Sequence, residues 1–471
     1  MVLPARPSAA QRRRSGKRGD GAHAAARRAG MQPEDGTVVE EDVGCSRHPV
    51  GRGARLVHRD AQHRPWHVVM PGRQRGQRIR DRQPEMPADS CGRADRHEPT
   101  AVLDELPERA VSMARLAPED KFAGLAPREL LAADLPLLDI DDPQEPPTSV
   151  LVERAREAEA AALAVEGVTN SEGGAADYGR TLVTLATSEG FLSGYAGTSS
   201  SVSVSVIAGE GSAMERDYAF ATARHDADLE AAAEVGRRAA ERAVKRLNPR
   251  KVNTQTVPVF FDPRVAPSLV SHFAGAISGA SIARGVSFLK DHLGKSVFPS
   301  GISIVDDPHR KRGLRSKPFD GEGVRNRRQT LLKNGVLQTW LLDSASARQL
   351  GLTTTGHAAR GTSGPPGPSA TNIYMEPGKL SPKELMADVK SGFYVTELIG
   401  QGVDSVTGDY SRGAAGFWID RGEIAYAVSE ITIAGNLKDM YQNLTPADDL
   451  EFRYGTNAPT LRVEGMTIAG A

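Results

Sequence analysis

The chain has 471 residues, and its 59 Lys and Arg balance 59 Asp and Glu, so the formal net charge is zero. This length exceeds one ordinary hydrophobic core and predicts two domains. No apolar run reaches the ~18 residues of a membrane span, and the first residues lack the apolar centre of a secretory signal. The only cysteines, Cys45 and Cys91, make a disulfide framework implausible, so we expect a cytoplasmic protein without a membrane segment.

Residues 1–100 differ in composition from the rest. They hold 20 Arg and Lys against 12 Asp and Glu, and no helical or strand period persists. A basic arm that binds nucleic acid, an organellar transit peptide and translation of GC-rich DNA in the wrong frame are the three interpretations. Acidic residues such as Glu40 and Asp42 argue against the transit peptide, and the abrupt change near Ala101 favours the wrong frame. We expect an irregular segment rather than a folded domain.

The pattern from residue 101 to 250 predicts an N-terminal mixed α/β domain. A helix is expected over Val150–Val165, with Thr148 or Ser149 as its N-cap, and a second amphipathic helix over Asp228–Leu247. In "SVSVSVIAG" valine alternates strictly with serine, which is typical of a half-buried antiparallel strand. The three strands predicted here are Arg180–Thr187, Ser199–Gly209 and Met214–Arg224.

A linker at "NPRK" sets the predicted domain boundary, and residues 251–471 have a different rhythm. A strand, "VPVFFDP", precedes a helix predicted over Arg264–Ala283, and a further helix over Ser381–Lys390 has Ser381 as its cap. Hairpin turns are predicted at Asn334-Gly335, Asp420–Gly422 and Glu464-Gly465. We therefore expect an α+β protein whose C-terminal domain is a mainly antiparallel β-barrel or sandwich with inserted helices.

His272, in "SHFAGAISGASIARG", raises the question of a metal site. A zinc peptidase helix needs two histidines on one face and a glutamate beside the first. Here Phe273 follows His272, Ala276 and Ile277 occupy the positions where a second histidine would stand, and residues 251–471 contain no cysteine. The residues favour a capping or packed histidine and predict neither a complete zinc site nor a catalytic residue.

Two further stretches carry candidate binding residues. "DYSRG", Asp409–Gly413, lacks the first glycine of a serine-hydrolase turn and is followed by strands, which favours an ordered loop. Asp409, Ser411 and Arg412 remain candidates for binding a peptide backbone or terminus. The basic run His309–Gly323 is either a solvated loop or a strip that faces a partner or substrate. Its single aromatic residue, Phe319, does not indicate nucleic-acid stacking.

Several long stretches together resemble one known family. "TNSEG", "FDGEG", "TWLLDSASARQLGLTTTGHA" and "GDYSRGAAGFWIDRGEIAYAVSEITIAGNLKDM" are similar to the TldD/PmbA family, and most closely to its PmbA branch, also called TldE. The resemblance runs from about Ala101 to the C-terminus. The family normally has an ordered start before that point, and residues 1–100 do not resemble it.

The resemblance implies a paired protein. TldD-like members carry a His-Glu-x-x-x-His helix and a C-terminal cysteine that bind one zinc, and PmbA-like members are their non-metal partners in a cytoplasmic peptidase for unfolded or modified peptides. His272 would match the first histidine, Phe273 the glutamate and Ile277 the second histidine. No cysteine lies near Arg453–Thr456 to match the thiolate.

On this resemblance the chain would line a peptide chamber, with His272, Asp409, Ser411 and Arg412 as substrate-binding residues. It would hold no cofactor, and the zinc would belong to a TldD-like partner. A sheet edge, or the strands flanking Ala415–Trp418, would bind an extended peptide through main-chain hydrogen bonds. Two alternatives remain open: a self-sufficient hydrolase that uses Ser411 or another nucleophile, and a peptide-binding or regulatory protein that does not cleave.

Overall fold

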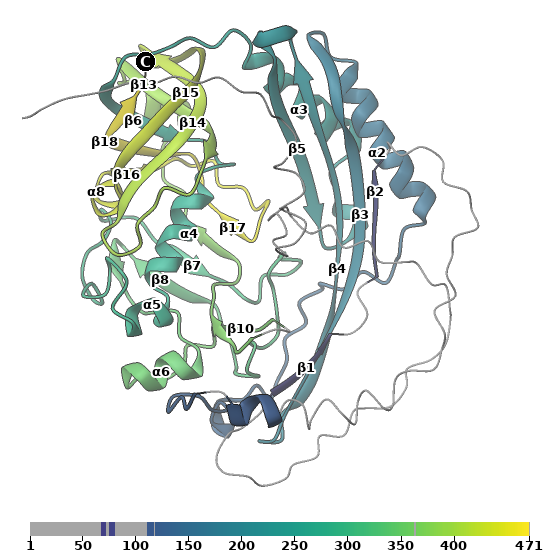
Figure 1. The fold of residues 1–471 in the computed structure, drawn as a ribbon, viewed down its shortest axis with the longest axis vertical. Coiled ribbons are helices and arrows are strands. Elements are labelled where there is room, and N and C mark those ends of the chain that lie inside the picture. Colours follow the sequence, from purple (N-terminus) through teal and green to yellow (C-terminus); the bar gives the residue numbers. More distant parts are fainter. Residues whose placement is uncertain (1–66, 72–74, 81–110, 117, 362–363, 471) are drawn as a thin grey trace, which may run out of the picture. The chain divides into compact units, whose positions relative to one another are not determined.

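An antiparallel sheet and two helices on one of its faces form the first part of the structure, as Figure 1 shows. The computed structural model describes residues 67–71, 75–80, 111–116, 118–361 and 364–470. Strand β3 (Val168–Thr187) pairs with β4 (Leu192–Ala208), and β4 pairs with β5 (Glu215–Ala223), all antiparallel. The prediction of three antiparallel strands is confirmed, although β3 begins twelve residues earlier than the predicted Arg180.

The alternation of valine and serine in β4 explains which face the helices cover. Val202, Val204 and Val206 are buried and pack against alanines of α3 (Ala232–Lys245), while the intervening serines face the other side. Helix α2 (Thr148–Leu163) lies beside α3, so closely that a Cβ on Gly236 would overlap the α2 backbone. The N-cap of α2 is Pro147, without a side-chain cap, which corrects the predicted cap at Thr148 or Ser149.

Two short strands come from the segment that the sequence predicted to be irregular. β1 (His67–Pro71) and β2 (Arg75–Arg80) pair antiparallel with consecutive stretches of β3. The expectation for residues 1–100 is therefore corrected at these two strands, and the rest of that segment lies outside the described residues. The edge of β3 explains the pairing, because its free N–H and C=O groups accept an extended segment whatever its side chains are.

A closed barrel is the main feature of the second part. Its strands run in the order β15, β14, β13, β6 and β18, and β18 pairs back onto β15. All neighbours are antiparallel except β13 and β6, so the predicted mainly antiparallel barrel is confirmed. The bounds are β6 (Gln255–Phe261), β13 (Ser391–Ile399), β14 (Asp409–Asp420), β15 (Glu423–Asn436) and β18 (Leu461–Ala469), with β16 (Leu444–Pro446) attached to β18.

A smaller mixed sheet and short helices complete this part. The sheet order is β17, β12, β7, β8 and β9, and a separate pair joins β10 to β11. The bounds of these strands are β7 (Ile304–Asp306), β8 (Gln329–Lys333), β9 (Val336–Leu337), β10 (Ala358–Ala359), β11 (Gly367–Pro368), β12 (Ile373–Met375) and β17 (Thr456–Asn457). The helices are α4 (Pro267–Ala276), α5 (Gly279–Ala283), α6 (Ser344–Leu350), α7 (Pro382–Met386) and α8 (Leu437–Gln442).

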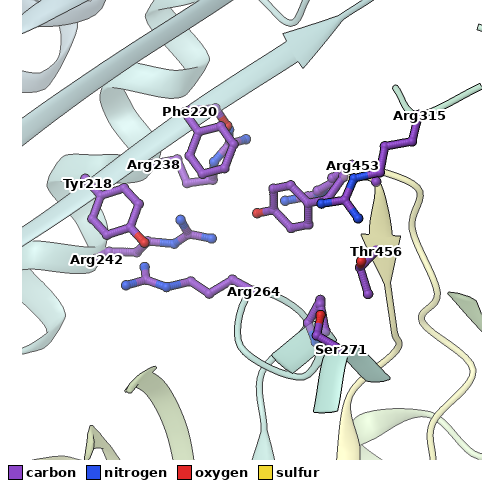
Figure 2. Close-up of a pocket in the computed structure, with 12 residues that line it drawn as sticks. Tyr218, Phe220, Arg238, Arg242, Arg264, Ser271, Arg315, Arg453 and Thr456 are labelled. Carbon is purple, nitrogen blue, oxygen red and sulfur yellow. The ribbon is translucent and has the colours of Figure 1, made fainter. Parts of the chain in front are cut away.

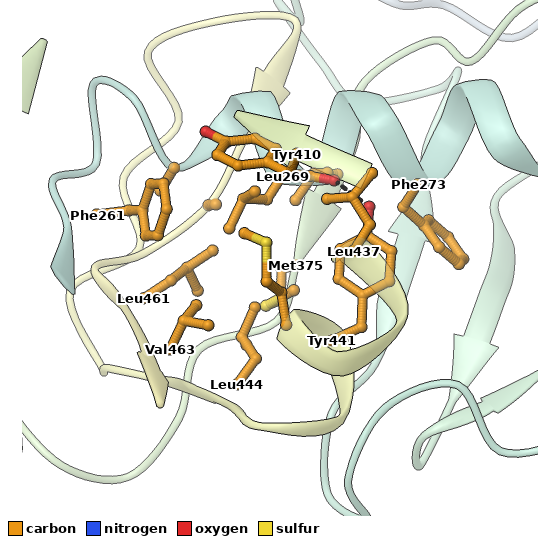
Figure 3. Packing of buried hydrophobic residues seen from close by; sticks show 14 of the residues in the cluster. Phe261, Leu269, Phe273, Met375, Tyr410, Leu437, Tyr441, Leu444, Leu461 and Val463 are labelled. Atoms are coloured by element: carbon orange, nitrogen blue, oxygen red, sulfur yellow. Dashed lines mark hydrogen bonds between the residues drawn. The ribbon is translucent and has the colours of Figure 1, made fainter. Parts of the chain in front are cut away.

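The core of this part joins the barrel, α4 and α8. Figure 3 shows Phe273 of α4, Tyr441 of α8 and Leu461 of β18 among its side chains. The hydroxyl of Tyr441 is fully buried and donates a hydrogen bond of 3.0 Å to the carbonyl of Leu269. Because a buried hydroxyl is costly without a partner, this bond fixes α8 against α4.

Two of the three predicted hairpin turns are confirmed. Asn334 and Gly335 have positive φ angles of 50° and 83°, as a two-residue turn that joins β8 to β9 requires. The turn through Gly422 joins β14 to β15. The third prediction was wrong, because β18 continues through Gly465 and the register against β6 shifts there, which is a β-bulge.

The predicted cap at Ser381 is confirmed. Its side chain and that of Glu384 form a capping box at the start of α7, although α7 ends at Met386, before the predicted Lys390. No helix among the described residues is long and apolar enough to cross a membrane. The predicted domain boundary near residue 250 stays a prediction.

Candidate functional site

Helix α4, which carries His272, is shorter than the sequence predicted. It begins at Pro267 and ends at Ala276, and a separate short helix, α5, follows from Gly279. The predicted single helix over Arg264–Ala283 was wrong because the backbone pairs with a distant segment at the break. Gly279 N–H donates to Leu341 O at 2.7 Å, and a Cβ at Gly279 would lie 2.6 Å from the Leu342 side chain.

Core side chains occupy the two positions that would match the glutamate and the second histidine of a zinc helix. Phe273 and Ile277 are fully buried, and Phe273 makes edge contacts with Phe298 and Tyr441 at ring-centroid distances of 5.6 and 6.4 Å. The described part of the chain contains no group of three or more His, Cys, Asp or Glu side chains arranged to hold a metal. The donor set around α4 therefore does not fit a zinc ion.

His272 instead faces Tyr410 and Arg412 of the barrel strand β14. Its ring makes an edge contact with the Tyr410 ring at 6.1 Å. The Nε2 of His272 is buried and makes no hydrogen bond within the described residues, whereas Arg412 is close enough to the buried hydroxyl of Tyr410 to act on its pKa. Burial, followed by the positive charge of Arg412, lowers the pKa of His272, while burial raises the pKa of Tyr410. At neutral pH this favours an uncharged His272.

The four predicted binding residues do not form one site. Along β14 the side chains alternate, so Asp409 and Ser411 are exposed on the face opposite Tyr410 and Arg412. Asp409 accepts hydrogen bonds from Thr407 Oγ1 at 2.7 Å and Asn436 Nδ2 at 3.0 Å, which lowers its pKa. These bonds make it part of a turn. Only His272 and Arg412 are brought together.

Ser411 has no activating partner. Its backbone N–H donates to Gly402 O at 2.7 Å, whereas its side chain is exposed and bonded to no histidine or carboxylate among the described residues. A serine nucleophile needs an adjacent base. The geometry therefore gives no support to a serine hydrolase.

The predicted main-chain binding of a peptide near Ala415–Trp418 is also corrected. β14 pairs with β13 on one side and with β15 on the other, and the barrel is closed, so these residues have no free edge. By contrast, β5 pairs only with β4 among the described strands and is an edge of the first sheet. Tyr218 and Phe220 lie on one face of this edge strand, exposed and stacked at 6.4 Å.

The edge strand β5 borders a cavity of about 310 Å³ that we call the arginine pocket. Figure 2 shows its arginines converging from separate elements. Arg238 and Arg242 are one turn apart on α3, Arg264 precedes α4, Arg315 belongs to the basic run His309–Gly323, and Arg453 precedes β17. The other lining residues are Tyr218, Phe220, Pro267, Ser271, Tyr454, Gly455 and Thr456, so no carboxylate lines the pocket.

Tyr218 and Arg264 also border a second cavity, of about 210 Å³. Arg412 lines that cavity, together with Ser268 of α4 and Glu397 of β13. The guanidinium of Arg264 lies over the Tyr218 ring at 5.2 Å and donates to the buried Asp217 at 2.8 Å. The N-terminal half of α4 thus contributes residues to both cavities.

The sequence analysis did not identify the arginine pocket, because its residues are dispersed from position 218 to position 456. Two local signals were present. Arg238 and Arg242 lie at i and i+4, on one face of a predicted helix, and Tyr218 and Phe220 lie at i and i+2 of a predicted strand. Neither pattern says that the two elements meet, since that depends on the packing of α3 against β5.

Comparison with known proteins shows that this fold is that of a metallopeptidase family. The PmbA/TldA metallopeptidase central domain matches residues 141–247, and the C-terminal domain of the same family matches residues 254–470. The fold is also that of TldE from Thermococcus kodakarensis, with a TM-score of 0.69 at 22% identity over 79% of this chain and 86% of that one.

Two named relatives place the chain more closely. It is 44% identical to metalloprotease PmbA of Escherichia coli O157:H7 over 77% of this chain and 79% of the relative. It is 42% identical to the metalloprotease PmbA homolog of Haemophilus influenzae over the same shares. The chain belongs to the PmbA/TldD family, in its PmbA branch, and the resemblance seen in the sequence is confirmed.

Proposed function

We propose that this chain is the non-metal subunit of a heterodimeric zinc metallopeptidase that acts on unfolded or modified peptides. The observation that carries the proposal is the buried state of Phe273 and Ile277, which fill the core at the positions where a zinc helix would need a glutamate and a second histidine. The family is named for metallopeptidase activity, so a TldD-like partner would supply the zinc and its activated water.

The role that remains for this chain is to bind the peptide. The edge strand β5 offers backbone groups to an extended peptide, a mode of binding that tolerates many sequences. Tyr218 and Phe220 add an exposed aromatic surface beside that edge, and the arginine pocket adjoins it. A cytoplasmic location is part of the proposal.

Co-purification followed by reconstitution tests the pairing. Tagged protein is recovered from its native cytosol, the second chain is identified by mass spectrometry, and zinc and peptide cleavage are measured for each chain and for the pair. We expect a partner that carries His-Glu-x-x-x-His, zinc only in that partner, and cleavage only by the pair. Chelation should abolish the cleavage, and added zinc should restore it.

Two outcomes would contradict the proposal in different ways. Stoichiometric zinc in the isolated chain, or cleavage by it, would show that it is a complete enzyme. Tight peptide binding without turnover, even with the zinc-bearing partner, would instead favour the alternative of a peptide-binding or regulatory protein.

A further inference from the structure

Two of the five arginines of the arginine pocket have no ion pair within the described part of the chain. Three of its five arginines have acidic partners: Arg238 pairs with Glu230, Arg264 with Asp217, and Arg453 with Glu451. Arg242 and Arg315 have no ion pair and no side-chain hydrogen bond within the described part of the chain. Two guanidinium groups without an ion pair thus line the same cavity, and burial together with the charges of Arg264 and Arg238 lowers the pKa of Arg242.

Arg242 is the more telling of the two, because it is half-buried. Burial, followed by the charge of the neighbouring Arg264, lowers its pKa, although the carboxylates of Asp262 and Asp217 act in the opposite direction. A half-buried cation without a hydrogen-bonding partner costs stability, and such groups are retained where a ligand completes them. Arg315 is exposed at the opposite side of the pocket, and its side chain lies against Gly455, where a Cβ would collide with it.

The shape of these groups selects the ligand. A guanidinium presents a planar fork of N–H donors that matches a carboxylate through two parallel hydrogen bonds. The rings of Phe220 and Tyr454 have their centroids 5.4 Å apart, and together they form an aromatic wall on which the rest of the ligand can pack. The cavity of about 310 Å³ is at the lower end of ligand sites, which suits one end or one side chain of a peptide.

The negative excess of residues 101–471 argues against a nucleic acid in this pocket. Residues 101–471 hold 47 Asp and Glu against 39 Lys and Arg, so a polyanion would meet overall repulsion outside the pocket. A single carboxylate would meet only the local positive field.

We propose that the arginine pocket binds a carboxylate of the peptide substrate through Arg242 and Arg315. The carboxylate is either the C-terminal group of the peptide or the side chain of an Asp or Glu near that end. The inference rests on the proposed role of this chain in binding peptides, and it names the chemical feature that the chain recognises.

Peptide binding to the isolated full-length chain tests this inference without the partner. Three hexapeptides of one uncharged sequence, each labelled at the N-terminus, differ only at the other end: a free carboxylate, an amide, and an amide with a Glu placed before it. Fluorescence anisotropy gives Kd for each. We expect at least one carboxylate peptide to bind about 10-fold or more tightly than the plain amide. Comparing the Kd of the two acidic peptides then shows whether the pocket prefers a C-terminal carboxylate or an acidic side chain.

The variant Arg242→Gln/Arg315→Gln should remove that preference, while the amide peptide keeps its Kd. The matched control is Arg237→Gln, because Arg237 lies on α3 beside the pocket arginine Arg238 but is exposed and pairs with Glu234 outside the pocket. It should keep the full preference. Circular dichroism of each variant checks that the fold is intact.

Equal Kd values for acid and amide peptides in the wild-type chain would overturn the inference, as would a preference that survives in the double variant. Preferential binding of a single-stranded oligonucleotide, with the steep salt dependence of phosphate contacts, would also overturn it. If the reconstituted pair cleaves peptides but shows no preference for a carboxylate, only the inference about the pocket fails. If the isolated chain prefers carboxylate peptides but no zinc-bearing partner is found, only the proposed heterodimer fails.

Discussion

Two charged regions of the molecule contrast in whether their charges have partners. The buried acidic network contains Asp306, Asp320, Glu322 and Asp343, all at most 2% exposed. Asp306 accepts two hydrogen bonds of 2.6 Å from Thr371, and Glu322 accepts two from Ser344 at 2.9 and 2.7 Å. The arginine pocket is open and leaves Arg242 and Arg315 without such partners.

The contrast separates buried carboxyl groups, whose hydrogen bonds stabilise the fold, from the pocket arginines that we propose bind a ligand. In the acidic network each carboxylate fixes a loop to its neighbour: Asp320 alone accepts from the backbone N–H groups of Glu322, Val324 and Ala358. Removing such a group leaves buried donors unpaired, which destabilises the protein. Removing Arg242 or Arg315 leaves no hydrogen-bond partner behind within the described residues, so the free energy of unfolding should hardly change, while peptide binding should weaken.

The largest expected effect follows from Asp306→Asn. The substitution keeps the size of the side chain but removes the charge and turns an N–H₂ group toward donors of Thr371 or toward His357, whose Nε2 lies 3.3 Å away. We expect the free energy of unfolding to fall by about 3 kcal/mol. Urea unfolding followed by the fluorescence of the buried Trp340 and Trp418 measures it.

The control for that prediction is Asp388→Asn. Asp388 is 70% exposed and pairs with Arg462 at 2.6 Å on the surface, so its loss should cost less than about 1 kcal/mol. Equal losses in the two variants would show that burial of the acidic network does not matter, and the contrast between the regions would fail.

The next effect is a pH dependence from Glu322. Burial, and then the nearby charge of Asp320, raise its pKa to about 7, although the hydrogen bonds from Ser344 act in the opposite direction. The native state therefore retains a proton that the unfolded state has lost above about pH 4.5, so stability should fall as the pH rises from about 4.5 to about 7. Burial raises the pKa of Asp320 as well, which adds to the same pH dependence.

Glu322→Gln should remove part of that slope. We expect the loss of unfolding free energy between about pH 5 and about pH 8 to shrink by on the order of 2 kcal/mol, measured by urea unfolding at several pH values. An unchanged slope would mean that Glu322 is ionised in the native protein throughout this range.

The sequence predicted the regular elements well where a local pattern decides them. The alternating valines of β4, the Asn334-Gly335 turn and the Ser381 cap each depend on a few adjacent residues, and each is confirmed. The end of α4 at Ala276 and the bulge at Gly465 were missed, because pairing with distant segments decides them.

The same reason limits prediction of the site. Asp409, Ser411 and Arg412 were grouped because they are adjacent in sequence, but strand alternation separates Arg412 from the other two. The arginine pocket combines five positions between 238 and 453, and no sequence period links them. The resemblance to a family gave the fold, whereas the pocket needed the packing of α3, β5 and α4.

A substitution in the arginine pocket should change the free energy of unfolding only slightly. Arg242→Met keeps the aliphatic stem of the side chain but removes a half-buried charge that lies near Arg264. We expect the free energy of unfolding to stay the same or to rise by up to about 1 kcal/mol. A loss of about 2 kcal/mol or more on urea unfolding would show that Arg242 is a structural residue and would place it with the acidic network.

The smallest effect is expected at His272, which belongs to neither region. Its Nε2 is buried without a hydrogen bond, so His272→Leu replaces an unsatisfied polar group by an apolar one of similar size. At neutral pH the free energy of unfolding should change by less than about 1 kcal/mol. The lowered pKa of His272 means that the unfolded state binds a proton more readily, so wild-type stability should fall as the pH drops below about 6.5.

The leucine variant should therefore become more stable than the wild type as the pH falls. This pH dependence has the opposite sign to the one expected from Glu322. Zinc separates this packed histidine from a metal ligand. If His272 only packs against Tyr410, added zinc leaves the melting temperatures of the isolated wild-type chain and of the variant equally unchanged. A rise in the wild type alone would mean that His272 binds metal, because a ligand that binds only the native state raises its stability.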